Sequence, residues 1–309
     1  MFDDTLHFLA NHLESPDWAR LGEHLPYEWV EQAVLSTEAT SIRHRRLPAE
    51  QVVWLMVALA LYRHKSISEV LDDLGLAMPD SQTPFVSKSA AAQARQRVGS
   101  EPLKWLFERS ARHWVAQDRK AYLFKGLQLF AMDGTTLRTH DTLENRNHFG
   151  AQSYASDTVA SYPQVRGVTL TSLPTHLVHS AAFGPYSTNE MLYAKQLIEA
   201  IPDESLTVFD RGFLSAEILC GLTGSGAERH YIIPSKSNTK WEALEAESDD
   251  MLVRMRVSPQ ARSKCPELPE FWEARAITVV DAQARKRILL TSLRDRRRYK
   301  PGDIAACYD

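Results

Sequence analysis

The period of the hydrophobic pattern changes near Leu123, and this change restricts the possible folds more than any other feature of the chain. Before it, apolar residues recur at helical spacing, and residues 47–64 are apolar nearly all round, as in a central helix. After it, residues 127–139, 164–173 and 175–184 are rich in Val, Thr and Leu, as strands are. The pattern predicts a helical amino-terminal domain, residues 1–120, and a sheet-containing domain, residues 121–309.

The second domain is predicted to hold a mixed sheet with helices packed on it. Its three strand-like segments are followed by a helix (187–201), a strand (205–213), a helix (215–226) and a strand (229–236). This order is compatible with a ribonuclease H-like core. Residues from about 238 to 290 look like a separate β-rich insertion, with strand-like segments at 251–258, 274–282 and 286–293. The predicted fold class is therefore α+β, a helical domain followed by a ribonuclease H-like α/β core.

Composition excludes several classes of protein. The formal net charge is −3 and 24% of residues are charged, so a nucleic-acid partner would have to be bound by local basic patches. The longest apolar run, Val52 to Tyr62, is too short to cross a membrane, and the first residues lack the pattern of a signal peptide. We expect a protein that acts in the cytoplasm and not at a membrane.

Two aspartates are the strongest candidates for chemistry. Asp133 and Asp210 each follow an apolar strand-like run, and each is followed closely by a glycine, Gly134 and Gly212. Neighbouring strands of one sheet could bring the two carboxylates together. Converging carboxylate oxygens are hard ligands that suit Mg²⁺ or Mn²⁺, and such ions can assist cleavage of a phosphodiester.

Both aspartates also have a simpler interpretation. Asp-Gly between two strand-like runs is the strongest short signal for a hairpin turn, so spacing alone favours a turn at Asp133. For Asp210, a helix N-cap or an ion pair with Arg211 is as well supported as a functional role. The residues alone leave these alternatives open.

Several separated segments resemble one family. Residues 132–150 (MDGTTLRTHDTLENRNHFG) and 208–219 (VFDRGFLSAEIL) resemble the first and second acidic motifs of DDE-type bacterial insertion-sequence transposases of the insertion-element-four group. Further similar segments are residues 25–34, 43–71, 87–107 and 233–242. The resemblance covers nearly the whole chain. It implies a ribonuclease H-like fold in which Asp133 and Asp210 are the first two acids of a catalytic triad and hold Mg²⁺ or Mn²⁺.

The resemblance also implies a reaction and its partners. In this family, metal-activated water attacks the phosphodiester at the end of the mobile element, and the freed 3′-hydroxyl then attacks target DNA. The expected partners are double-stranded DNA, at the element ends and at the target, and a second copy of the chain in the synaptic complex. The expected location is the bacterial cytoplasm, in association with the nucleoid.

The third acid of the catalytic triad has no counterpart among the motifs of this sequence. The resemblance implies a Glu in a helical motif after the insertion, and residues 289–309 lead towards such a helix without containing a Glu. We therefore expect a chain truncated at its carboxy terminus, which binds metal weakly and cleaves DNA inefficiently by itself. One alternative is a truncated, inactive remnant that binds element-end DNA. Another is a metal-dependent nuclease that cleaves independently of element ends.

Candidate DNA contacts lie where basic residues outnumber acidic ones, in residues 85–130 and 285–300. Residues 66–76 followed by 87–99 resemble a helix-turn-helix with a basic second helix, although the loop between them is long. An ordinary amphipathic helix with a solvated basic face is the alternative. The candidate contact residues are Lys88, Arg95, Arg97, Arg211, Lys236, Arg296, Arg297 and Arg298.

Overall fold

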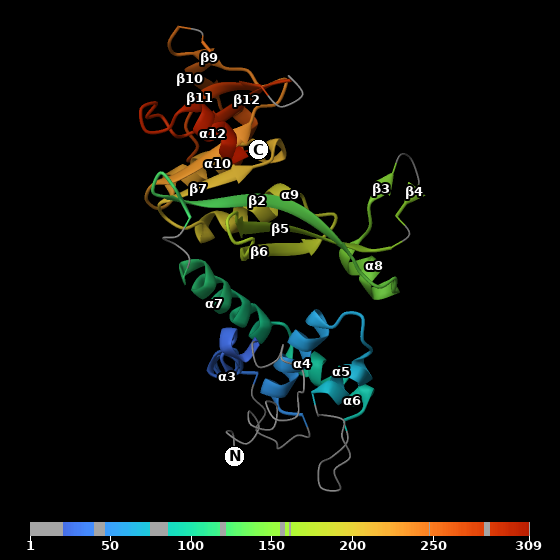
Figure 1. The fold of residues 1–309 in the computed structure, drawn as a ribbon. Helices are drawn as coiled ribbons and strands as arrows, with labels where there is room; N and C mark the ends of the chain where they lie inside the picture. Colours follow the sequence, from blue (N-terminus) through green and yellow to red (C-terminus); the bar gives the residue numbers. More distant parts are fainter. Residues whose placement is uncertain are drawn as a thin grey trace. The chain divides into compact units, whose positions relative to one another are not determined.

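A computed structural model describes residues 21–39, 47–74, 86–117, 122–154, 158–160, 162–246, 248–280 and 285–308. Its contacts divide the chain into two compact units, Met1–His113 and Trp114–Asp309. The described part of the first unit is helical, and the second is built on a large sheet (Figure 1). No described helix is long and apolar enough to cross a membrane.

The first unit is organised around one apolar helix. Its helices are α3 (Tyr27–Ser36), α4 (Ala49–Leu61), α5 (Ile67–Asp73), α6 (Lys88–Val98) and α7 (Glu101–Gln117), the last of which runs into the second unit. Helix α4 contacts α3, α5 and α6, and Val52, Val53 and Leu55 are fully buried, so the prediction of a central helix is confirmed.

The helix-turn-helix prediction falls on α5 and α6. Ser66 caps α5 through a capping box with Glu69, and Ser87 caps α6 by accepting a hydrogen bond from the Ala90 backbone N–H. Most of the long connection between the two helices, residues 75–85, lies outside the described residues.

The second unit contains one 10-stranded sheet, whose strands lie in the order β6-β5-β2-β7-β8-β12-β11-β10-β9, with β1 paired to β2. Strand β2 pairs in parallel with β7, and β7 pairs in parallel with β8, whereas the other pairs are antiparallel. The strands are β1 (Leu123–Phe124), β2 (Leu127–Arg138), β5 (Gln164–Ser172), β6 (Val178–Pro185), β7 (Ser205–Phe209), β8 (Arg229–Pro234), β9 (Glu242–Ala243), β10 (Asp250–Arg256), β11 (Phe271–Val280) and β12 (Lys286–Thr291).

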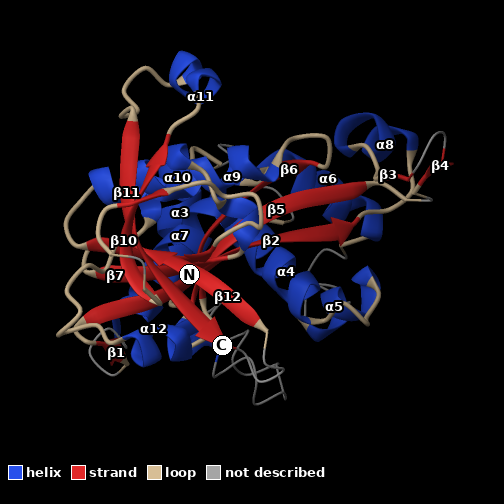
Figure 2. Cartoon of the chain, turned by 90° about the horizontal axis from the view of Figure 1, so that it is seen from above, coloured by secondary structure: helices blue, strands red, loops and turns tan. Residues whose placement is uncertain are grey.

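Helices occupy the positions predicted between the strands. The two predicted helices are α9 (Glu190–Leu197) and α10 (Ala216–Gly224). Figure 2 also labels α8 (Leu143–Phe149), α11 (Pro259–Lys264), which lies beyond the ends of the strands, and α12 (Pro301–Tyr308). Two 3₁₀ turns, η2 (Ile198–Ala200) and η3 (Arg211–Phe213), and a two-stranded ribbon of β3 (Ser153–Tyr154) and β4 (Thr158–Val159) complete the unit. The predicted order of three strands, helix, strand, helix and strand is confirmed, with α8 and the ribbon inserted after the first strand.

The segment predicted as a separate insertion continues the same sheet. Strand β12 pairs with β8, and β11, β10 and β9 extend the sheet outward from β12. The three strand-like segments were placed correctly, but hydrophobic alternation carries no information about which strand is the neighbour of which. The extension is thus joined to the core through backbone hydrogen bonds between β8 and β12.

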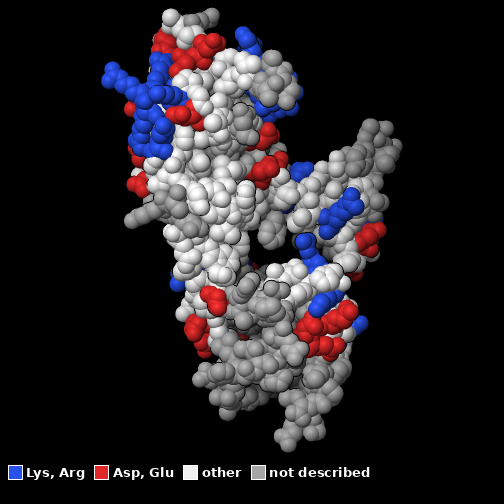
Figure 3. All heavy atoms as spheres, viewed as in Figure 1, with Lys and Arg blue, Asp and Glu red and all other residues white. Residues whose placement is uncertain are grey.

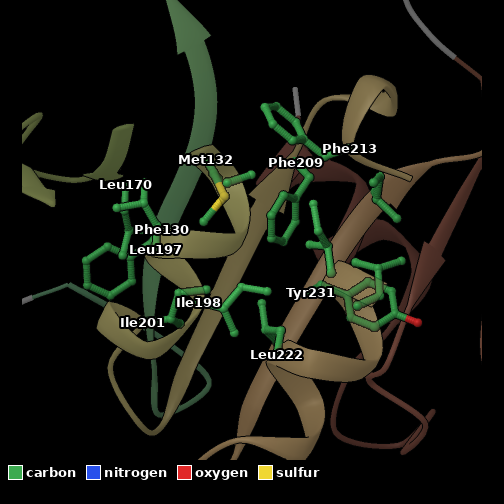
Figure 4. Close-up of a cluster of buried hydrophobic side chains, with 14 of the residues drawn as sticks. Phe130, Met132, Leu170, Leu197, Ile198, Ile201, Phe209, Phe213, Leu222 and Tyr231 are labelled. Atoms are coloured by element: carbon green, nitrogen blue, oxygen red, sulfur yellow. The ribbon is translucent and has the colours of Figure 1, made fainter. Parts of the chain in front are cut away.

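Alternation along the strands divides the core between the two faces of the sheet. Phe130, Met132 and Phe209 pack with α9 and α10 in the cluster drawn in Figure 4. Leu127 and Leu206 belong to a second cluster that contains Ile304 of α12. Since successive side chains of a strand point to opposite faces, the two clusters lie on opposite sides of the sheet.

A fully buried arginine ties the sheet extension to the segment before α12. Arg275 on β11 is 0% exposed and makes two hydrogen bonds to the Asp250 carboxylate, of 2.6 and 2.7 Å. Its Nη1 also donates to the backbone carbonyls of Leu293 and Tyr299. A buried guanidinium with this many partners fixes the path of the chain between β12 and α12.

Candidate active site at the end of the parallel strands

Asp133 and Asp210 lie side by side in the sheet. In the parallel pair of β2 and β7, Met132 is the register partner of Phe209; Asp133 is the next residue of β2, and Asp210 directly follows the end of β7. Both side chains are exposed. The structure therefore places the two aspartates next to each other where the parallel pairing of β2 and β7 ends; open α/β sheets commonly bind ligands beyond the carboxyl ends of their strands.

The prediction of a hairpin turn at Asp133 is wrong. Strand β2 continues without interruption to Arg138, and Asp133 and Gly134 pair with Thr169 and Val168 of β5. The pairing with β7 ends at Met132, so β2 extends beyond its neighbour from Asp133 onward. A strand that continues beyond its neighbour leaves the Asp133 side chain exposed on a rigid backbone.

Asp210 has the capping role that was one of its alternatives. It precedes η3, and its Oδ2 accepts a 3.1 Å hydrogen bond from the Gly212 backbone N–H. The Asp133 carboxylate accepts a similar bond, of 2.8 Å, from the Gly134 N–H to Oδ1. These bonds orient both carboxylates and engage one oxygen of each. Capping and ligand binding can therefore coexist at Asp210.

A third carboxylate, which sequence reasoning did not select, lies against the residue after Asp133, on the face of the sheet that α9 covers. Glu190 is the first residue of α9, and a Cβ placed on Gly134 would overlap its carboxylate. Burial raises the pKa of the Glu190 carboxyl above its ordinary value; Arg166 opposes this rise, and the charges of Asp133 and Asp210 add to it. The sequence signal that could have selected Glu190 is the helix start at Asn189–Glu190, shortly after the third strand.

The chemistry of the donors fits a hard divalent cation. Carboxylate oxygens are the ligands that Mg²⁺ and Mn²⁺ prefer, and two adjacent acids repel each other unless a cation lies between them. Among the described residues, no group of three or more His, Cys, Asp or Glu side chains already has the arrangement of a complete metal site. The two aspartates would thus supply part of a coordination shell that water and other ligands complete.

The predicted DNA-contact residues are spread over several elements. Lys88 and Arg95 are exposed on α6, whereas Arg97 donates a hydrogen bond to the Leu47 carbonyl. Arg211 is exposed in η3, next to Asp210, and Lys236 lies half-buried after β8.

The arginines at 296–298 lie near the start of α12. Arg296 forms ion pairs with Glu245 and Asp250, Arg297 is exposed, and Arg298 donates to the Lys125 carbonyl and lies over the Tyr299 ring. Figure 3 shows basic side chains gathered beside acidic ones on the face towards the viewer. The ion pairs of Arg296 reduce the positive charge that it could offer to a phosphate.

Comparison with known proteins identifies relatives over nearly the whole chain. Residues 16–108 match the family described as insertion element 4 transposase N-terminal, and residues 125–309 match the transposase DDE domain. The alternative of an inactive remnant gains no support from these matches.

Two relatives come from Escherichia coli strain K12. The transposase InsG for insertion sequence element IS4 is 36% identical over 93% of this chain and 64% of its own length. The putative transposase InsZ is 35% identical over 79% of this chain and 81% of its own length. The chain thus spans less than two thirds of the length of InsG.

A solved structure of the piggyBac transposase synaptic complex with hairpin DNA was compared with this chain. The alignment covers 80% of this chain and 51% of the chain in that structure. The TM-score is 0.34 and the identity 13%, a likeness too low to support an argument. The family assignment rests on the two matched domains and on the two Escherichia coli relatives. On that ground, the chain belongs to the insertion-element-4 family of DDE transposases.

Proposed function

We propose that this protein cleaves DNA at the ends of an insertion sequence and joins the freed ends to target DNA, and that Asp133 and Asp210 hold the divalent metal ion required. The observation that carries the proposal is the register of β2 and β7, which puts the two aspartates side by side. In this proposal the sheet domain has a ribonuclease H-like fold. The protein acts on DNA in the bacterial cytoplasm.

The two aspartates would act by holding the divalent ion and fixing its position. Their backbone hydrogen bonds fix both carboxylates, so that their remaining oxygens are available to Mg²⁺ or Mn²⁺. When bound, such an ion polarises a phosphodiester and lowers the pKa of water, which neither carboxylate can do alone. Arg211, exposed in η3, is placed to contact a phosphate near the metal.

Efficient cleavage is proposed to need the third family acid as well. The acids that follow β12 among the described residues are Asp295 and Asp303, and both are already engaged. Asp295 accepts hydrogen bonds from the backbone N–H groups of Arg297 and Arg298, and Asp303 pairs with Lys125. We therefore assign neither Asp295 nor Asp303 as the third acid.

The position of the metal relative to DNA can be mapped without relying on catalytic turnover. With Fe²⁺ in place of Mg²⁺, peroxide generates hydroxyl radicals at the bound ion, which cut nearby DNA. We expect cuts concentrated at the tip of a duplex that carries the end of the element encoding this chain. They should disappear in Asp210→Asn and persist in Glu199→Gln, an exposed acid in η2, beyond the other end of α9. Cuts scattered along the duplex, or unchanged in Asp210→Asn, would contradict the proposal.

The amino-terminal unit is proposed to bind the element ends through α6. Lys88 and Arg95 are seven residues apart and exposed, so they share one helix face. Replacing both with Ala should reduce the slope of log affinity against log salt by about 2, because each phosphate contact contributes about 0.9. Lys65→Ala is the matched control, since Lys65 is already paired with Asp73 at 2.6 Å. An unchanged slope in the double variant would rule out these contacts.

The protein is further proposed to pair two ends as a homodimer. Light scattering should then show two chains for every two end duplexes in the complex. A complex that holds a single chain at saturating DNA would contradict this part of the proposal.

A further inference from the structure

Strand β6 forms one edge of the 10-stranded sheet (Figure 1), and this edge lacks the features that commonly protect edge strands. Within the described residues, β6 pairs with β5 alone. Its residues, VHSAAFGP, include no Lys, Arg, Asp or Glu. The opposite edge is different, because β9 has two residues and one of them is Glu242. Proteins usually shorten or charge their edge strands, since an unprotected edge can pair with another chain.

The available part of this edge is the middle of β6. The pairing of β5 with β6 is irregular at Leu170/Thr171, near the start of β6, and the Tyr186 N–H, just after its end, donates to the Phe149 carbonyl at 2.8 Å. Between these points lies the segment 180–184, which is in regular register with β5. Four of its five residues are Ser, Ala or Gly, so small side chains leave the backbone open to another strand.

Phe183 projects from the face of β6 that α9 does not cover. Ala182 packs in the cluster with α9, and the side chain of the next residue, Phe183, points to the opposite face. A Cβ on Gly167, its register partner in β5, would lie 3.2 Å from the Phe183 Cβ and 3.8 Å from the Thr135 Cγ2, so these residues share that face. Phe183 is 71% exposed there, and Leu137, two residues after Thr135 on β2, is 61% exposed. Exposed apolar side chains gathered on one face are typical of an interaction surface.

The segment 180–184 is complementary to itself. When two copies of the strand pair antiparallel about a two-fold axis through Ala182, Ala181 of one copy lies opposite Phe183 of the other, and Ser180 lies opposite Gly184. Opposed residues share a face of the sheet, so each exposed ring would lie against a small side chain and not against another ring. A two-fold contact requires a surface of this kind, because the same patch serves on both copies.

We propose that two copies of this chain associate by antiparallel pairing of their β6 edges, about a two-fold axis at Ala182 that is perpendicular to the sheet. This inference rests on the proposed function, in which a homodimer pairs two element ends, and it names the surface that joins the two chains. Asp133 is in register with Thr169 and Ala181, so β2 lies two strands from the edge. The Asp133 residues of the two copies would then be five strand spacings, about 24 Å, apart on the same face of one continuous sheet.

Disulfide formation tests the register of this pairing. In the double variant Ala181→Cys/Phe183→Cys, each new thiol lies opposite a new thiol of the other copy, with Cβ atoms about 4.5–5.5 Å apart, so oxidation should yield a covalent dimer. Phe183→Cys alone should not cross-link, because the two copies of residue 183 are diagonal neighbours about 7–8 Å apart. The single variant also controls for the native thiols of Cys220, Cys265 and Cys307, which are half-buried.

Association itself is measured by sedimentation equilibrium of the 309-residue chain, alone and with end duplexes. Phe183→Lys should raise the dissociation constant of the dimer by about 10-fold or more, because a Lys on an edge strand opposes pairing and the two added charges lie close together. Its Tm as a monomer should equal that of the wild type, since the Phe183 side chain is exposed. Val280→Lys is the matched control, because Val280 is also an exposed strand residue but lies on β11, away from β6.

The outcomes separate this inference from the proposed function. If Phe183→Lys associates as the wild type does and the double cysteine variant does not cross-link, while two chains still bind two end duplexes, the homodimer forms through another surface and only the inference fails. If the wild type is a monomer with and without end duplexes, the inference and the proposed homodimer both fail. Weaker association of Phe183→Lys, together with cross-linking of the double variant, supports the inference.

Discussion

Replacing Asp210 with Asn should weaken Mn²⁺ binding by about 100-fold or more while leaving the fold intact. A group that only orients a metal ligand accounts for about 10–100-fold in affinity, and a direct ligand should account for at least the upper end of that range. Asn is a good capping residue, so the hydrogen bond that Asp210 accepts from the Gly212 N–H can be kept. The variant also removes the repulsion between Asp210 and Asp133, so the metal-free protein should not be less stable.

Thermal unfolding with and without Mn²⁺ measures this effect. At a free Mn²⁺ concentration about 100 times the wild-type Kd, binding stabilises the wild type by about 2.7 kcal/mol. A variant with 100-fold weaker binding is stabilised by only about 0.4 kcal/mol at the same concentration. Glu199→Gln should behave as the wild type. A variant that keeps the full Mn²⁺-dependent stabilisation would show that Asp210 is a cap and nothing more.

Truncating Arg275 to Ala should produce a large loss of stability. The guanidinium is fully buried, and its removal leaves the carbonyls of Leu293 and Tyr299 without this donor and the Asp250 carboxylate with Arg296 alone. Arg275 holds the pKa of the Asp250 carboxyl below its ordinary value, which reflects how strongly the charged form depends on this arginine. Removing one partner of a buried pair costs about 3–5 kcal/mol. Because Asp250 is partly exposed and keeps Arg296, we expect the lower end of this range, or roughly 10 °C in Tm for a unit of this size.

The matched control for this prediction is Arg254→Ala, on the neighbouring strand. Arg254 pairs with Glu273 at 2.9 Å, but its side chain is 40% exposed, so its loss should cost at most about 1 kcal/mol. Chemical denaturation of both variants gives the comparison. Similar losses in the two would mean that the Arg275 network contributes no more than a surface ion pair.

The order of strands and helices could be predicted because each element carries its own local signal. In β7, Leu206 and Phe209 belong to the clusters on opposite faces of the sheet, and Asn189 and Glu190 are the cap and the first residue of α9. These signals come from residues that are close together in the sequence, so they can be recognised without the structure. The pairing of β12 with β8 depends on residues far apart in the chain, and no local pattern encodes it.

Asp133 shows where a local rule fails. Asp-Gly between two apolar runs is common in hairpins, but the glycine here serves a tertiary contact: it makes room for Glu190, which lies 56 positions further along the chain. The family resemblance favoured the functional interpretation of Asp133 where spacing favoured a turn. With glycine at this position, the Glu190 carboxylate can lie directly against β2.

Glu190 and Arg275 could not be selected from the sequence for a related reason. Each is an ordinary charged residue in its own segment, and its contacts come from residues far away in sequence: Gly134 of β2 for Glu190, and Asp250 with two carbonyls for Arg275. Arg296 illustrates the converse, because it belongs to a basic run in sequence yet is paired with Glu245 and Asp250 in the structure.

The central claim is that Asp133 and Asp210 together hold one divalent cation. A crystal of the 309-residue chain soaked in Mn²⁺, with anomalous diffraction data, tests it most directly. The account predicts an anomalous peak between the two carboxylates, at about 2.0–2.3 Å from an oxygen of each, and no such peak in Asp210→Asn crystals treated in the same way. Mn²⁺ bound elsewhere while the space between Asp133 and Asp210 shows no peak would contradict it.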